Sequence, residues 1–89
     1  MSELINISIE EIEQRAKRSK ALLENEWFVE TIKNLREEQK TVFADSSAQE
    51  VEKREDAHAI LRALNAIEVS LKADVDAMAL LQKKGKHLG

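Results

Sequence analysis

The sequence predicts an all-α protein, folded as an antiparallel helical hairpin of two long helices, and three features of its composition indicate this. The 89 residues include no proline and only two glycines, so almost nothing interrupts a helix. Ala, Leu, Glu and Lys, all strong helix formers, are abundant. No cysteine is present, which excludes a disulfide framework and a thiolate metal site. A chain of this length forms one small domain, which we expect to gain stability from an oligomeric bundle.

The first half of the chain has a well-marked helix start. Residues 1–7 form a lead-in, and Ser8 and Glu11 have the spacing of a capping box. Apolar residues at helical spacing then predict helix over residues 8–44. This apolar stripe shifts around the helix near Asn25, which is a good N-cap residue. We expect either one long bent helix or two helices that meet at Asn25, which would give three helices in all.

The second half reads as a single long helix. Residues 45–47 form the turn, and the capping-box pattern from Ser47 to Glu50 predicts a helix over residues 48–84. Gly85 suits the left-handed position that ends many helices. Because the connection is short, the two halves are expected to be antiparallel neighbours.

The long helix has two apolar faces. One carries large residues and is expected to pack on the first half of the chain: Ala57, Ile60, Leu61, Leu64, Ile67, Leu71, Val75, Met78 and Leu81. The other, here called the alanine face, lies roughly 120° away and consists of small residues: Ala59, Ala63, Ala66, Ser70, Ala73 and Ala77. A helix with a single partner needs only one apolar face, so the alanine face predicts a protein interface. Its partner is either the N-terminal segment, folded back at Asn25, or a second chain; the alternative is an exposed face of strong helix formers.

Trp27 and the basic residues are further candidates for contact with partners. Trp27 and Val29 are not on the same side of the helix as Phe28, which is in register with the core, so we place them either against the N-terminal segment or at a protein interface. The alternative is that Trp27 closes the small core. Possible phosphate contacts are Arg15, Lys17, Arg18, Lys20, Lys83, Lys84 and Lys86, the last in a basic tail over residues 85–89. Acidic residues exceed basic ones by 17 to 14, so a nucleic-acid partner is the less favoured interpretation.

One short motif resembles half of a metal site. Glu55 and His58 have the E-x-x-H spacing of helical di-iron proteins, to which Glu26 or Glu30 of the first half would have to contribute in a dimer of hairpins. Both motif residues lie on the polar side of the helix, away from the large apolar face. We therefore interpret them as a solvated pair, and expect no metal or other cofactor.

Several functional classes lack support in the sequence. It has no Ser-His-Asp arrangement, glycine-rich phosphate loop or thiol nucleophile, so we expect no enzyme activity. No apolar run approaches the ~18 residues of a membrane span, and the start lacks the pattern of a signal peptide. These observations indicate a cytoplasmic protein without a membrane partner.

Two stretches carry a resemblance to a group of viral proteins. Leu22-Leu23-Glu24-Asn25-Glu26-Trp27-Phe28, the later Arg54-Glu55 and Leu61-Arg62-Ala63-Leu64, and the Gly85-Lys86 tail resemble small helical proteins encoded among the structural genes of tailed bacteriophages. Proline often follows the asparagine in those proteins, whereas Glu26 follows it here.

The resemblance implies a component of phage assembly, made in the cytoplasm of a bacterial host and retained in the virion or released from it. The expected function is therefore non-enzymatic helix packing, with a second copy of the chain or with a larger phage protein. The alternatives are a small regulatory binder of nucleic acid or of a host protein, and a ferritin-like metal-binding dimer.

Overall fold

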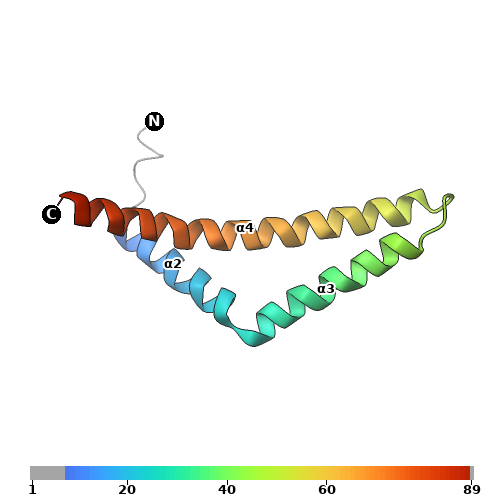
Figure 1. Ribbon diagram of the computed structural model, residues 1–89, viewed down its shortest axis with the longest axis horizontal. Helices are drawn as coiled ribbons and strands as arrows, with labels where there is room; N and C mark the ends of the chain where they lie inside the picture. The colour runs from blue at the N-terminus through green and yellow to red at the C-terminus, as the bar shows by residue number, and fades with distance from the viewer. Residues whose placement is uncertain (1–7, 89) are drawn as a thin grey trace.

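The computed structural model describes residues 8–88, with side chains to residue 84, and this part of the chain is entirely helical apart from its connections. Three helices follow one another: α2 (Ile9–Glu24), α3 (Glu26–Asp45) and α4 (Val51–Leu88). They form a flat triangle in which α4 is the long side (Figure 1). The predicted all-α class is confirmed; the lead-in over residues 1–7 lies outside the described residues.

The start of α2 follows from the residue at its N-cap. Ser8 has an extended backbone, and its Oγ accepts a 3.1 Å hydrogen bond from the backbone N–H of Glu11. This contact is one half of the predicted capping box and satisfies a donor that the first turn leaves free. Glu10 and Glu11 add negative charge where the helix dipole favours it.

Asn25 interrupts the first half of the chain. The sequence left open one bent helix or two helices that meet at Asn25, and the structure has two helices. Asn25 has φ −78° and ψ 117°, and its N–H donates to the carbonyl of Leu22 at 3.1 Å. Its Oδ1 accepts from the N–H of Phe28 at 2.9 Å, and its carbonyl accepts from the N–H of Val29 at 3.0 Å. A single residue therefore ends α2 and caps α3.

The connection to α4 is longer than the predicted turn over residues 45–47, and the helix begins at Val51 rather than at residue 48. The reason is that Glu50, not Ser47, acts as the cap. The Glu50 carboxylate accepts a 2.9 Å hydrogen bond from the Ser47 N–H, and its carbonyl accepts the 3.2 Å bond from the Arg54 N–H that opens the helix. The Arg54 guanidinium also donates to the carbonyl of Ser47, which ties the loop to the first turn of α4.

The predicted end of the long helix at Gly85 is wrong, because α4 continues to Leu88. A glycine ends a helix when it adopts a left-handed conformation, and no glycine among the described residues has a positive φ. Without that conformation, glycine remains in a helix at a modest cost.

The core is a narrow contact zone along one side of α4. Both α2 and α3 pack on α4, α3 against its first part and α2 against its second (Figure 1). The side chains buried there are few and mostly small: Ala16, Ser19, Ile32, Ala57 and Leu64. Ile60 and Ile67, expected in the large apolar face, remain 41% and 44% exposed because the two shorter helices do not extend around α4 far enough to cover them.

Candidate interaction surface

The alanine face of α4 is not covered by any other part of the described chain. All six of its residues are exposed: Ala59, Ala63, Ala66, Ser70, Ala73 and Ala77. At about 100° per residue, Ala66 lies about 160° around the helix from the buried Leu64. The contacts of α2 and α3 therefore lie on the opposite side of α4.

The structure shows whether the N-terminal segment is the partner of the alanine face. The N-terminal segment does fold back at Asn25, but α2 packs beside Val75 and Met78 of the large apolar face. The prediction that this segment might cover the alanine face is therefore wrong. Because α2 and α3 both lie on one side of α4, the opposite side has no partner in the described chain.

Large apolar side chains flank the exposed alanine face. Ile60 and Ile67 lie along one edge, and Val69, which is 65% exposed, lies on the other. Leu80 continues the face towards the end of the helix and is also exposed. The exposed apolar surface is therefore a strip along much of α4 rather than scattered single residues, which is the kind of surface that marks interaction sites.

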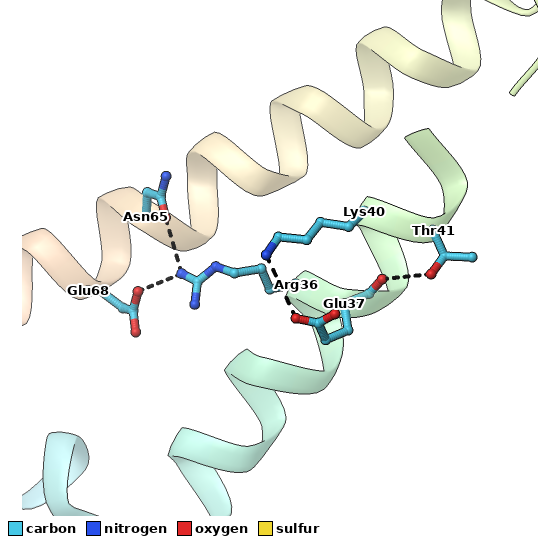
Figure 2. A network of polar contacts seen from close by, with 6 residues as sticks. All are labelled: Arg36, Glu37, Lys40, Thr41, Asn65 and Glu68. Carbon is cyan, nitrogen blue, oxygen red and sulfur yellow. Dashed lines mark hydrogen bonds and ion pairs between the residues drawn. The ribbon is translucent and has the colours of Figure 1, made fainter. Parts of the chain in front are cut away.

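Two polar contacts that the sequence did not predict fix the shorter helices on α4. Ser19, only 4% exposed, donates from its Oγ to the Oδ2 of Asp74 at 2.6 Å and so joins α2 to α4. Arg36 of α3 lies between two acceptors on α4, with one guanidinium nitrogen 3.1 Å from the Oδ1 of Asn65 and 2.5 Å from the Oε1 of Glu68 (Figure 2).

A sequence signal for these contacts exists. Asp74 and Glu68 lie on the side of α4 that faces the other helices, close to apolar residues such as Leu71, and a charged residue at such a position needs a partner. The identity of the partner depends on how α2 and α3 are tilted, which periodicity does not reveal. These contacts position the shorter helices on one side of α4 and leave the alanine face open.

Trp27 lies at the corner of the triangle and is 78% exposed, so it is not part of the core. Val29, also exposed, lines a shallow hollow on α3 whose other lining residues include Glu24, Glu26 and Glu30. The alternative in which Trp27 faces the N-terminal segment is wrong for the described part of that segment, because α2 does not cover this side chain. Trp27 stays a candidate for contact with a partner, some distance from the alanine face.

The basic residues on α2 do not form one cluster. All of Arg15, Lys17, Arg18 and Lys20 are exposed, and Arg15 lies 3.5 Å from the carboxylate of Glu11. Lys17 and Lys20 border an open groove of about 310 Å³ between α2 and α4, whose floor includes Val75 and Met78. Lys83 and Lys84 are exposed on α4; the side chain of Lys86 lies outside the described residues.

The E-x-x-H motif lies on the surface. Glu55 and His58 are both exposed, and the His58 ring lies 6.5 Å from the ring of Phe43, tilted by 59°. Within the described residues, no group of three or more His, Cys, Asp or Glu side chains is placed to hold a metal ion. The motif therefore has no second set of ligands among the residues that the structure describes.

Comparison with known proteins adds no family to this description. No protein-family model, curated protein or solved structure matches the chain. Among the described residues, no helix combines the length and the apolar content that crossing a membrane requires.

Proposed function

We propose that this protein is a non-enzymatic helical assembly protein that acts by packing the alanine face of α4 against another helix. The observation that carries the proposal is the unequal coverage of α4, which has two apolar faces but buries only one of them. An apolar face that the chain itself leaves open is best explained by an intermolecular partner.

The residues of the alanine face suit close helix packing. Helix axes approach to about 8–10 Å, and the smallest side chains allow the shortest distances. The first and last of the six, Ala59 and Ala77, are 18 residues apart, which corresponds to about 27 Å of helix. Ile60, Ile67 and Val69 at the edges add larger apolar groups that a partner would remove from water.

The resemblance to small phage proteins supports a role for this packing in virion assembly. In that setting the partner is a second copy of the chain or a larger phage protein, and the protein acts inside the bacterial host. Binding through the basic residues of α2, to nucleic acid or to a host protein, is the competing proposal. Phosphate binding weakens steeply with salt, whereas apolar helix packing does not.

Light scattering on the purified protein, with glutamate placed on the alanine face, tests the proposal. Ala63→Glu and Ala66→Glu should dissociate the assembly, because each would bury a charge in a close helix contact. Ala21→Glu is the matched control, since Ala21 is an exposed alanine on α2. A monomeric wild type, with helicity and stability unchanged by both substitutions, would show that the alanine face has no packing role.

A further inference from the structure

Five residues beside the alanine face recur at every seventh position of α4 and carry an ordered pattern of charge. They are Glu55, Arg62, Val69, Asp76 and Lys83. We call them the flanking row. All five are exposed, and none of the four charged members takes part in an ion pair within the described residues. Read along the helix, the row is negative, positive, apolar, negative, positive.

This order is complementary to itself when reversed. Reversal about Val69 places Glu55 against Lys83, and Arg62 against Asp76. Two antiparallel helices related by a two-fold axis bring the same flank of each helix together. Parallel helices instead bring opposite flanks together. The flanking row of one chain therefore meets the flanking row of a second copy only in the antiparallel arrangement.

We propose that the partner of the alanine face is a second copy of this chain, bound antiparallel about a two-fold axis beside Val69. This inference rests on the proposed function and names the partner, its direction and its alignment. In it, Arg62 of each chain pairs with Asp76 of the other, and Glu55 with Lys83. Val69 of each chain meets its own counterpart at the axis.

The alanine face fits the same alignment. Ala59 lies opposite Ala77 of the second copy, Ala63 opposite Ala73, and Ala66 opposite Ser70. These three pairings, each made twice, give a continuous zone of small side chains in which two helices approach closely. At the next position outwards, Glu52 of one copy lies near Lys84 of the other, whereas the pairing of Asp56 with Leu80 is a mismatch along this face.

The opposite edge of the face is compatible with this pairing. Ile67 meets Ile67 of the second copy near the axis, which covers two half-exposed apolar side chains. Ile60 approaches Asp74, whose carboxylate is turned towards Ser19 of its own chain and so is already hydrogen-bonded. In this dimer the two copies of α4 form the centre, with α2 and α3 of each chain on the outside.

Other alignments are disfavoured by the same charges. A shift of seven residues in one direction places Arg62 opposite Lys83, and in the other direction it places Glu55 opposite Asp76. Both are like-charge contacts. In a parallel pair the flanking row would meet the edge that contains Ile60 and Ile67, so each charged side chain would lie beside an apolar one. Exposed ion pairs add little affinity, so their role here is to select the direction and alignment.

Charge reversal tests the alignment directly. In the Arg62→Glu variant, the new carboxylate lies beside Asp76 of the second copy on both sides of the axis. In the Asp76→Arg variant, the new guanidinium lies beside Arg62 of the second copy in the same way. Each single variant should weaken dimerisation about tenfold or more at low salt. The double variant restores both pairs and keeps the net charge of the wild type, so its dissociation constant should return close to the wild-type value.

Two controls with the same changes of charge lie on α3, away from the proposed interface. Lys33→Glu matches Arg62→Glu and Glu38→Arg matches Asp76→Arg, and both residues are exposed. These variants should leave the dissociation constant within about twofold of the wild type. Sedimentation equilibrium at low and high salt gives the constants for all of the variants.

Cross-linking supplies a second measurement, because the chain has no cysteine of its own. Ala59→Cys alone should stay monomeric on a non-reducing gel, since the two copies of residue 59 lie about 27 Å apart along the antiparallel pair. An equal mixture of Ala59→Cys and Ala77→Cys chains should form a covalent dimer on oxidation.

Failure of this inference is distinguishable from failure of the proposed function. A cross-link formed by Ala59→Cys alone, or a double charge variant no better than the singles, overturns the antiparallel alignment. If Ala63→Glu still dissociates the assembly in that case, the alanine face keeps its packing role. A wild type that is monomeric at every concentration overturns the second copy as the partner.

Discussion

The hydroxyl of Ser19 donates a 2.6 Å hydrogen bond to the carboxylate of Asp74, and this bond joins two helices that lie 55 residues apart in the sequence. Ser19 is the one buried polar residue among the described residues, on the contact side of α2 beside Ala16. A partly buried carboxylate without a donor is costly, so Ser19 both fills the space and satisfies the charge.

We predict that Ser19→Ala lowers the free energy of unfolding by about 1–2 kcal/mol, because the Asp74 carboxylate loses its donor inside the contact. Urea denaturation followed by circular dichroism measures the change. Ser19→Ala combined with Asp74→Ala should cost less than the sum of the two single changes, since no unsatisfied group is left. Thr31→Ala, which removes an exposed hydroxyl on α3, is the control and should have little effect.

Arg36 is expected to make a measurable contribution through its two partners on α4. Arg36→Lys should cost about 0.5–1 kcal/mol of unfolding free energy, because the flexible lysine side chain has no planar guanidinium to hold a nitrogen between Asn65 and Glu68. The pair is about a quarter to a third exposed, so the effect should shrink as salt is added. The role of this pair would be contradicted if the difference in stability between the wild type and the lysine variant were the same at low and at high salt.

We predict that the stability of the fold depends on pH through the ionisation of Glu50, at the start of α4. The backbone N–H of Ser47 and the ammonium group of Lys53 lower the pKa of Glu50 below its ordinary value. A group whose pKa is lower in the folded state stabilises the fold above its unfolded pKa of about 4.3. That stabilisation is lost as the pH falls through the folded pKa. A carbon-detected NMR titration of the Glu50 carboxyl should give a pKa below the ordinary value.

Two variants separate the causes of this shift. Lys53→Met removes the smaller contribution, so the pKa of Glu50 should rise only part of the way to its ordinary value. Glu50→Gln removes the titrating group, so the stability of this variant should fall less than that of the wild type between pH 5 and pH 3. An ordinary pKa for Glu50 would mean that the Ser47 contact does not persist in solution.

Local patterns predicted the first half of the fold well. Ser8 and Asn25 are N-caps whose side chains satisfy nearby backbone donors, so the residues that determine these helix boundaries lie within a few positions of one another. The start of α4 is harder to predict from the sequence. Between Ser47 and Glu50 the structure forms only the glutamate half of a capping box, in which the Glu50 carboxylate accepts from the Ser47 N–H. Gly85 does not end α4, because glycine permits a left-handed ending without requiring one.

The interaction surface was predictable only in part. Periodicity located the alanine face, because side chains of one size recur on one side of α4. Whether α2 covers that face depends on the angle between α2 and α3 at Asn25. That angle is set by tertiary contacts such as the one between Ser19 and Asp74. The partial exposure of Ile60 and Ile67 has the same origin, since it reflects how far α2 and α3 extend around α4.

The bend at Asn25 leads to a prediction about the next residue, Glu26. Glu26 is the first residue of α3, where the backbone N–H has no partner within the helix and proline is well tolerated. The extended conformation of Asn25, with ψ 117°, is also the one that a residue before proline prefers. Glu26→Pro should therefore raise the free energy of unfolding by about 0.4–1 kcal/mol, because it restricts the unfolded chain without straining the fold.

The opposite outcome is equally informative, because it depends on whether α2 and α3 are separate helices in solution. If the two helices formed one continuous helix, proline at position 26 would remove an internal hydrogen bond and cost about 3 kcal/mol. Glu30→Pro, inside α3, shows that cost and serves as the control. Asn25→Ala should lose about 1 kcal/mol through the missing cap to the Phe28 N–H. Thermal unfolding of the three variants therefore measures whether the corner of the triangle is present in solution.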